Sequence, residues 1–482
     1  GLKLKQISTD RNISLFGLSK LSGLSTSYLN EIEKGKKYPK PDKIAALSEH
    51  LEVPYDEMVS LKLDKNLAPI GEILQSKVLK EIPLEIFGIQ ESTMIDIVSN
   101  APTKVTAFIS TIIEIAKNYN FSRENFYLAS VRSFQEANNN YFDDLEQAVL
   151  AFAKTYHVDL TKPLNSIELE DILVEEYGYT INATELESHT ELDNLRSIFV
   201  PKSKTLLLAK HIDDAQKTFI YAKEIAYNYL KITERLYTFS WIKFENFDQV
   251  LNNFYASYFA GALIIPRARI VSDLETLFSK KTFKVKDFER IINNYNASPE
   301  SIYHRLTNIL PKDFNLKNLF FLRFSYEKGS NKFHLNKELH LSKHQSPRAN
   351  ETNEKYCRRW VSLKVLDEIS KTNSPHVFDI QVSNYSNEDE SYLVMSSATQ
   401  DPFTPNGFRS VSIGIQLNNQ FKRKVAFAES KSLFKTTVGV TCERCAISDC
   451  EVRQAEPEII TSTLKDQKIA DVVSQLHEKY SK

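Results

Sequence analysis

Residues 13–37 read ISLFGLSKLSGLSTSYLNEIEKGKK and predict two helices joined by a tight turn. Leucines recur along the first helix at the spacing of one helical face. Gly23 supplies the positive φ that a sharp reversal needs. Ser25 then caps the second helix, which ends at Gly35. We expect the two helices to share a small core of Leu18, Leu21, Leu24, Leu29 and Ile32.

The exposed side of the second helix carries short hydroxyl and amide side chains, which can read base edges in a DNA major groove. The expected DNA-binding residues are Ser25, Thr26, Ser27, Tyr28, Asn30 and Lys34, with Lys36 and Lys37 meeting phosphate. The run SxxYLNEIEKGKKYP resembles the helix-turn-helix of the Xre/Cro repressor family, which implies binding to a double-stranded DNA operator. The alternative is a helical hairpin with no role on DNA. Residues 1–43 carry nine Lys or Arg against four Asp or Glu, a net charge of +5 that favours DNA binding.

The composition is that of a soluble globular protein of about three domains. Of 482 residues, 42% are hydrophobic and 26% are charged, and the net charge of −1 argues against a polyanion-binding surface on the whole chain. No segment reaches the apolar length that spans a bilayer, and no signal peptide is recognisable. We therefore expect a cytoplasmic bacterial protein with no membrane partner.

The patterning predicts a multidomain chain. Residues 1–63 are expected to form an all-α DNA-binding domain, and residues 64–160 a helical connector. Amphipathic helices at 105–118 and 123–157, the second interrupted at 138–140, make this connector a candidate surface for a homodimer. They read equally as ordinary core helices. Residues 161–310 and 311–482 are expected to form two α+β domains.

Residues 161–310 are expected to contain strands at 179–182, 197–201 and 205–209, then a helix capped by Asp213. This layout resembles the ImmA/IrrE peptidase family, whose zinc motif is His-Glu-x-x-His. The present chain has Lys223-Glu224-Ile225-Ala226-Tyr227 at that place. Protonated Lys cannot bind zinc, and Glu224 alone cannot activate water. We expect a degenerate peptidase fold with no catalytic residues and no enzyme activity.

Short alternating segments from residue 317 onward predict an antiparallel sheet with flanking helices, and residues 464–480 predict a final amphipathic helix. All four cysteines fall in this part of the chain. Cys442, Cys445 and Cys450 form a CxxCxxxxC run, and Cys357 can join them in the fold. Four thiolates suit zinc or an iron–sulfur centre. The uneven distribution, with a single CxxC, favours a 4Fe–4S cluster, and four nearby arginines could offset its charge: Arg358, Arg359, Arg444 and Arg453.

Residues 300–456 resemble the short-chain fatty acyl transcriptional regulator family, which includes regulators of propionate and methylcitrate metabolism. The matching pieces are Tyr303-His304-Arg305-Leu306, Cys357 with Trp360, and VTCERCAISDCEVRQAEP at 440–457. Family members join an Xre-type helix-turn-helix, a degenerate ImmA-like region and a cysteine-bearing domain. The resemblance implies a DNA-binding regulator that responds to an acyl-CoA and carries a cluster. The family has Pro after its first cysteine, where this chain has Arg358.

An acyl-CoA needs cations for its phosphates and an apolar slot for its acyl group. Candidates are Lys202, Lys204 and Lys210 near the hairpin, Lys223 and Tyr227 at the former zinc motif, and Arg267 and Arg269 after an apolar helix. The alternative for each Lys is an exposed surface charge. For Arg305, the alternative to a role in binding is a structural role within the fold.

Two other functions are compatible with the same sequence. One is an antitoxin-like or anti-repressor protein whose ImmA-like half acts on a partner. The other is a pure redox or iron sensor in which the ImmA-like part is a scaffold.

Overall fold

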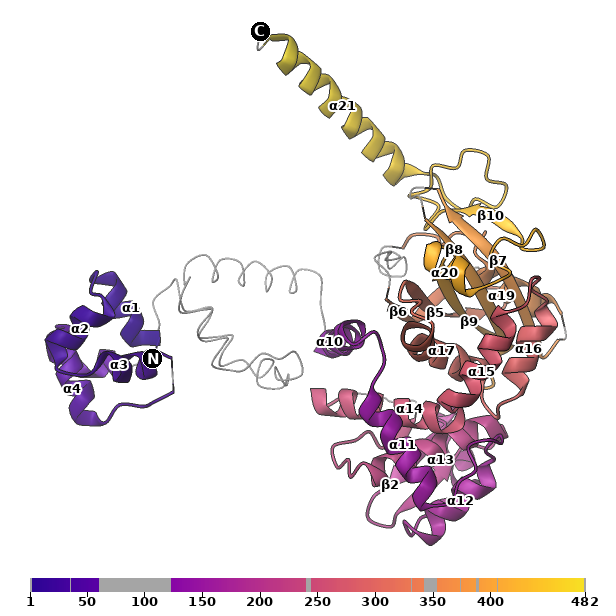
Figure 1. The fold of residues 1–482 in the computed structure, drawn as a ribbon, viewed down its shortest axis with the longest axis horizontal. Coiled ribbons are helices and arrows are strands. Elements are labelled where there is room, and N and C mark those ends of the chain that lie inside the picture. Colours follow the sequence, from indigo (N-terminus) through magenta and orange to yellow (C-terminus); the bar gives the residue numbers. More distant parts are fainter. Residues whose placement is uncertain are drawn as a thin grey trace. The chain divides into compact units, whose positions relative to one another are not determined.

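The computed structural model describes residues 2–34, 36–59, 123–239, 244–330, 332–341, 353–372, 374–386, 390–404 and 406–480. The helix expected at 105–118 and the helix end expected at Gly35 lie outside these residues. The chain divides into two compact units (Figure 1). The N-terminal unit consists of residues 1–134 with 243–250, and the C-terminal unit consists of residues 135–242 with 251–482.

The N-terminal module is all-α, as predicted, and consists of five short helices. They are α1 (Leu2–Asp10), α2 (Leu15–Ser22), α3 (Thr26–Glu33), α4 (Pro41–His50) and α5 (Tyr55–Val59). The module encloses its own core of Leu4, Ile7, Leu18, Leu29, Ile32, Leu47 and Leu51. One predicted core residue is wrong: Leu21 is 49% exposed. It lies in the last turn of α2, where its position on the helix face is no longer covered by a neighbouring helix.

Two helices follow within the predicted connector, namely α10 (Arg123–Ala137) and α11 (Asp143–Thr155). The predicted interruption between them is confirmed, and its cause is visible in the backbone. Asn139 and Asn140 have φ of 49° and 50°. Asn is among the few side chains that accept this left-handed conformation, so the helix ends here.

A four-stranded sheet follows α12 (Ser166–Glu175). Its strands are β1 (Thr180–Asn182), β2 (Ser197–Val200), β3 (Thr205–Leu208) and β4 (Thr238–Phe239), in the order β1-β3-β2-β4. The predicted hairpin pairs β2 with β3 in antiparallel fashion, and β1 adds to β3 in parallel. Two 3-10 turns, η2 (Glu185–Ser188) and η3 (Thr190–Leu192), precede β2. Helix α13 (Asp214–Tyr229) then starts at a capping box formed by Asp213 and Gln216.

Four helices connect this sheet to the next one. They are α14 (Phe247–Ile264), α15 (Arg267–Phe278), α16 (Val285–Asn293) and α17 (Pro299–Asp313). Ser298 caps α17 by accepting a hydrogen bond from the Ser301 backbone N–H, and Pro299 occupies the first helical position. The apolar stretch from Tyr258 onward is buried in α14, as expected of a core element.

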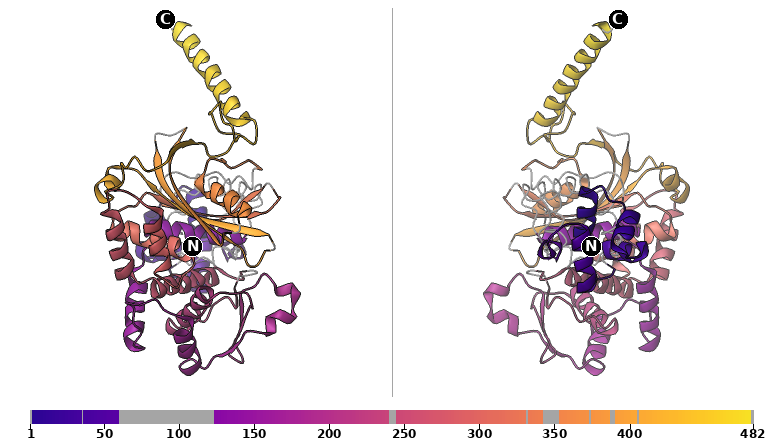
Figure 2. Two further views of the ribbon diagram at one scale, coloured as in Figure 1. Left: turned by 90° about the vertical axis from the view of Figure 1, so that its right-hand side faces the viewer. Right: turned by 90° about the vertical axis from the view of Figure 1, so that its left-hand side faces the viewer.

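The C-terminal strands form a six-stranded sheet (Figure 2). It comprises β5 (Leu319–Glu327), β6 (Phe333–His340), β7 (His376–Tyr385), β8 (Ser391–Gln400), β9 (Gly407–Gln416) and β10 (Lys435–Val438), in the order β10-β7-β8-β9-β5-β6. All neighbouring strands are antiparallel except β10, which runs parallel to β7. The predicted sheet after residue 317 and its α+β pattern are confirmed, and the predicted antiparallel pairing is wrong only for β10.

Both faces of this sheet are buried against helices. Phe320, Leu322 and Phe324 alternate along β5 toward the core that contains α19 (Val361–Lys371). On the opposite face, Phe321 meets His304 of α17 at 5.7 Å between ring centroids. Gly414, opposite Phe320 on β9, leaves room for that ring, because a Cβ there would lie 2.2 Å from it.

The chain ends with α20 (Asn419–Lys424), β10 and the long α21 (Glu458–Tyr480). The predicted C-terminal helix is therefore confirmed and starts six residues earlier than expected. None of its residues is buried. Within the described parts of the chain, every helix is too short or too polar to cross a membrane. Whether residues 161–310 and 311–482 are separate domains stays a prediction, since most of both ranges lies in one compact unit.

Candidate functional site

The turn between α2 and α3 is fixed by local hydrogen bonds. Gly23 has φ of 68° and closes α2 by donating its N–H to the Ser19 carbonyl. The Ser19 hydroxyl donates to the Leu24 carbonyl at 2.6 Å. Ser25 accepts a hydrogen bond from the Tyr28 N–H at 3.2 Å and so caps α3. These bonds set the angle at which α3 leaves the turn.

Helix α3 buries Leu29 and Ile32 and leaves its first turns open to solvent. Ser25, Thr26, Ser27 and Asn30 are exposed, Tyr28 and Lys34 are half-buried, and Lys36 and Lys37 are exposed. All eight predicted DNA-binding residues are therefore exposed or half-buried on α3 and directly next to it. This is the arrangement of a recognition helix that enters a major groove by its N-terminal residues.

The two exposed lysines after α3 differ in their surroundings. Lys37 lies 3.6 Å from a carboxylate oxygen of Glu31 and over the Tyr28 ring at 5.0 Å. Lys36 makes no ion pair within the described residues, so it is the better candidate for an unshared phosphate contact.

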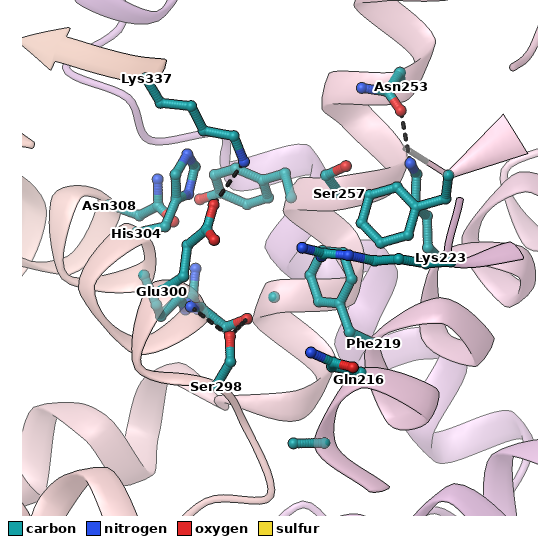
Figure 3. A pocket seen from close by; sticks show the side chains of 17 residues that line it. Gln216, Phe219, Lys223, Asn253, Ser257, Ser298, Glu300, His304, Asn308 and Lys337 are labelled. Carbon is teal, nitrogen blue, oxygen red and sulfur yellow. Dashed lines mark hydrogen bonds and ion pairs between the residues drawn. The ribbon is translucent and has the colours of Figure 1, made fainter. Parts of the chain in front are cut away.

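A cavity of about 180 Å³ lies in the C-terminal unit, between α13, α14, α17 and the strands β4 and β6 (Figure 3). Its polar lining includes Lys223 and Gln216 on α13, Asn253 and Ser257 on α14, Ser298, Glu300, His304 and Asn308 on or next to α17, Lys337 on β6, and Arg196 just before β2. Phe219 and Phe239 form its apolar part.

The α17 side of the cavity holds a compact ion-pair group. Lys337 lies 2.6 Å from one carboxylate oxygen of Glu300, and Arg323 lies 3.5 Å from the other. Burial alone would raise the pKa of Glu300, but these two cations hold it well below its ordinary value. Burial lowers the pKa of His304 to about 4. Near neutrality Glu300 is therefore ionised and His304 is neutral.

The α13 side of the cavity is cationic. Lys223 is 6% exposed, and its ammonium donates to Asn253 Oδ1 at 2.6 Å (Figure 3). Burial lowers the pKa of Lys223 to about 7. Arg196 lies over the Phe239 ring at 5.2 Å, and burial lowers its pKa to about 10. Both groups are held in a place that disfavours their charge.

Lys223 and Tyr227, the positions compared above with the two histidines of a zinc motif, share one face of α13. Tyr227, one turn after Lys223, places its hydroxyl 3.5 Å from the same Asn253 oxygen. Glu224 is tied elsewhere: Arg235 donates to both of its oxygens at 2.5 and 2.7 Å, and the Tyr179 hydroxyl donates at 2.9 Å. A carboxylate so fully engaged is not available as a general base.

Of the seven acyl-CoA candidates, the structure brings only Lys223 to the cavity. Lys202 is exposed, and Lys204 donates to the Tyr177 carbonyl at 2.9 Å. Arg267 forms a bidentate pair with Asp313, and Arg269 donates to the Asn294 carbonyl. Tyr227 contacts Asn253 but does not itself line the cavity. Lys210, also considered from the sequence, pairs with Glu187 at 3.0 Å.

The lining residues that were not predicted from the sequence as ligand contacts include Arg196, Glu300, His304 and Lys337. These four come from three elements that are distant in the chain. His304 lies in the run Tyr303-His304-Arg305-Leu306, which carries a family resemblance but no ligand-binding pattern. The other three carry no local signal, because their proximity results from packing α17 and β6 against the region of β2.

The four cysteines line one small hollow, as the sequence predicts. The cause is a short antiparallel bridge between Tyr356 and Thr441. Cys357 N–H donates to the Val440 carbonyl at 3.0 Å, and Cys442 N–H donates to the Lys355 carbonyl at 2.8 Å. Residues 85 positions apart in the sequence are thereby placed side by side.

The thiols in this hollow are free, and Cys357, Cys442 and Cys445 are buried. Burial raises the pKa of the Cys357 thiol to about 11. Such a thiol ionises near neutrality only if a cation replaces its proton. Four thiols are the kind of donor set that zinc or an iron–sulfur centre takes. Among the described residues, however, no three or more His, Cys, Asp or Glu side chains stand in a metal-binding group.

Arginines surround the hollow, but their roles differ from the prediction in one case. Arg358, Arg359 and Arg453 line it. Arg453 donates to the carbonyls of Cys442 at 3.1 Å, of Cys445 at 3.4 Å and of Ile447, and so shapes the loop. Arg444 instead forms a bidentate pair with Glu354, at 2.8 Å for each bond.

Comparison with known protein families agrees with the geometry of the first five helices. Residues 4–58 match the family model described as helix-turn-helix. The N-terminal module is a helix-turn-helix domain.

Beyond this domain the similarities are distant. The chain is 22% identical over 333 residues to the HTH-type transcriptional regulator RamB of Mycobacterium tuberculosis, in strains CDC 1551/Oshkosh and H37Rv. The match covers 64% of this chain and 65% of each relative, so it spans less than two thirds of their length. A solved structure of a Mycobacterium tuberculosis transcriptional regulator is 18% identical, with a TM-score of 0.49, over 68% of this chain and 93% of that one.

Proposed function

We propose that this chain is a DNA-binding transcriptional regulator whose C-terminal unit binds a short-chain acyl-CoA as effector. The observation that carries the proposal is the helix-turn-helix domain with the exposed hydroxyl and amide side chains of α3. The presence of a polar cavity in the same chain supports a response to a small molecule. The names of the distant relatives, both transcriptional regulators, point the same way.

In this proposal the region of α13 is a degenerate ImmA/IrrE-like fold that no longer acts as a peptidase. The support is chemical. Lys223 and Tyr227 occupy the places of the two zinc-binding histidines, and Glu224 is held by Arg235 and Tyr179. Lys223 instead faces the cavity, where its ammonium is available to an anionic ligand.

The regulator is proposed to act as a homodimer. A helix-turn-helix dimer places two recognition helices about one turn of DNA apart and reads a palindromic operator. A ligand that changes the spacing of the two helices would then change operator affinity. Such a response needs no contact between effector and DNA.

A metal centre held by Cys357, Cys442, Cys445 and Cys450 completes the proposal, with a 4Fe–4S cluster preferred over zinc. The convergence of all four thiols on one hollow supports it. When bound, the centre would hold together segments 355–357 and 440–450 more firmly than the hydrogen bonds between them do.

The full chain, purified without oxygen, should select a recurring sequence from a random duplex library. Adding propionyl-CoA or butyryl-CoA should change the affinity for that sequence, whereas free CoA should not. The change should be absent when residues 1–59 are tested alone. Failure to enrich any sequence would refute the DNA-binding proposal. Enrichment with no effect of any acyl-CoA would refute the effector only.

A further inference from the structure

The cavity between α13 and α17 contains more positive than negative charge. Four cations line it, namely Arg196, Lys223, Arg305 and Lys337, with Glu300 as the only acid among the described lining residues. Lys337 is paired with Glu300 at 2.6 Å. Arg305 is paired at 2.6 Å with Glu146, which stands behind the cavity wall.

Arg196 and Lys223 remain without a carboxylate partner in the described part of the chain. They approach each other through one aromatic ring: Phe239 has the Arg196 guanidinium at 5.2 Å from its centroid and the Lys223 ammonium at 4.7 Å. Among the described residues, the Lys223 ammonium donates to the neutral Asn253 amide oxygen and to no other acceptor. The Arg196 guanidinium donates to no acceptor in the described residues, although its position over Phe239 and Phe403 at 5.2 Å each orients it.

Holding the buried Lys223 ammonium and the half-buried Arg196 guanidinium without a counterion is unfavourable unless something else supplies the negative charge. Aromatic faces offset part of this cost, but they are weak partners compared with a carboxylate. A simple aliphatic acyl group would leave both cations uncompensated. A ligand with a carboxylate at this position would compensate them, and the flat guanidinium of Arg196 is suited to bind it through two hydrogen bonds.

We propose that the ligand of this cavity carries a carboxylate, which Arg196 and Lys223 bind against the Phe239 ring. The group could belong to a free dicarboxylic acid or to the dicarboxylic acyl chain of a thioester. This inference rests on the proposed effector function of the cavity and narrows the class of effector. The presence of Glu300 in the same cavity favours a single carboxylate over a phosphate dianion, which the acid would repel.

Matched ligand pairs test the inference on the full chain by isothermal titration calorimetry. Malonyl-CoA and isovaleryl-CoA differ by a carboxylate in place of an isopropyl group of similar size. Malonamate and isovaleramide form the corresponding pair without CoA, and succinyl-CoA and succinate test a longer chain. The carboxylated member should bind about 10- to 100-fold more tightly, as expected for charge-assisted hydrogen bonds.

Variants identify the residues. Arg196→Gln and Lys223→Met should each remove most of the preference for the carboxylate and leave binding of isovaleryl-CoA unchanged. Lys217→Met is the matched control, because Lys217 lies on α13 but does not line the cavity. Circular dichroism melting and operator binding verify that each variant is folded. A variant that fails to fold is replaced by Arg196→Lys or Lys223→Gln, which should weaken the same preference.

Each outcome decides one question. Equal binding of malonyl-CoA and isovaleryl-CoA, or binding of neither pair, overturns the carboxylate inference. Free CoA binding that is equally sensitive to Arg196→Gln also overturns it, because the cations would then bind CoA phosphates. Binding of free dicarboxylates without any CoA ester supports the carboxylate and removes acyl-CoA as the effector.

Discussion

Arg305 and Glu146 form a buried bidentate ion pair that joins α17 to α11. The two guanidinium nitrogens donate to the two carboxylate oxygens at 2.6 and 2.9 Å, and the side chains are 1% and 8% exposed. The remaining Arg305 Nε donates to the Ile265 carbonyl at the end of α14. This agrees with a structural reading of Arg305. Because the pair backs the wall of the cavity, it also fixes α17, which carries Glu300 and His304.

Breaking this pair should destabilise the C-terminal unit strongly. Arg305→Met leaves a buried carboxylate without a partner, and we expect a loss of about 3–5 kcal/mol of unfolding free energy. Urea unfolding monitored by tryptophan fluorescence measures it. Replacing both residues by Met should cost less than Arg305→Met alone, because no unpaired charge then remains.

A partly exposed pair provides the control. Arg267 forms a similar bidentate contact with Asp313, but its side chain is 41% exposed. Arg267→Gln should therefore cost only about 0–1 kcal/mol. An equal loss of unfolding free energy from Arg267→Gln and Arg305→Met would show that burial is not what makes the Arg305–Glu146 pair important.

Mutations in the helix-turn-helix domain should distinguish contacts to DNA phosphates from contacts to DNA bases. Lys36→Ala removes an expected phosphate contact, so it should weaken binding to all sequences alike and lower the slope of log affinity against log salt by about 1. Asn30→Ala removes an expected base contact and should mainly reduce the preference for operator over random DNA. Fluorescence anisotropy at several salt concentrations distinguishes the two. A similar loss of specificity from both variants would contradict the assigned orientation of α3.

Much of the secondary structure could be predicted because its signals are local. The capping serines, the Gly23 turn, the hairpin at 197–208 and the alternating strands after residue 317 each depend on neighbours in the sequence. Leu21 shows the limit. Helical spacing puts it beside Leu18, but whether a third element covers that part of the face is decided by packing.

The cysteine hollow and the cavity also differ in how far they could be predicted from the sequence. The cysteine hollow was predictable because three of its thiols lie within nine residues. The cavity was not, since Arg196, Lys223 and Lys337 are brought together only by the packing of separate elements. Of its cations, Lys223 was found because it replaces a residue of a known motif. Arg196 stands alone before a strand and resembles any surface arginine.

Loss of one thiol should remove the proposed metal centre. Cys445→Ser should abolish the iron and sulfide content of protein purified without oxygen, and it should lower the melting temperature of the C-terminal unit. Limited proteolysis should then move to sites beyond about residue 310, while a fragment near 1–64 stays intact because that module has its own core. Ser448→Ala, an exposed change in the same loop, is the control.

Metal analysis gives the decisive comparison. One zinc per chain and no iron in the wild type would mean that the four cysteines hold structural zinc and not a 4Fe–4S cluster. Unchanged metal content and melting in Cys445→Ser would contradict the four-cysteine site. A variant that lacks all four cysteines should contain no zinc, since Lys223 and Tyr227 are poor zinc ligands. Zinc retained there would contradict the degenerate-peptidase proposal.

Binding of a carboxylate in the cavity should take up a proton near neutral pH. In the free protein the pKa of Lys223 is lowered from 10.5 to about 7. Burial is the main cause, Arg235, Lys337 and Arg196 act in the same direction, and only Glu224 opposes the shift. A bound carboxylate favours the charged ammonium and raises this pKa again. Affinity for malonyl-CoA should therefore be highest below pH 7 and fall as the pH rises above it, by up to about tenfold per pH unit.

Calorimetry in buffers of different ionisation enthalpy counts the proton directly. Near pH 7.5 the protein should take up a fraction of one proton when it binds malonyl-CoA. It should take up none when it binds isovaleryl-CoA, because that ligand brings no charge to Lys223. Lys223→Met should abolish the uptake and flatten the fall in affinity above pH 7. Lys217→Met should preserve both. A pH-independent affinity for malonyl-CoA in the wild type would mean that Lys223 does not bind the carboxylate, and Arg196 alone would have to account for any preference.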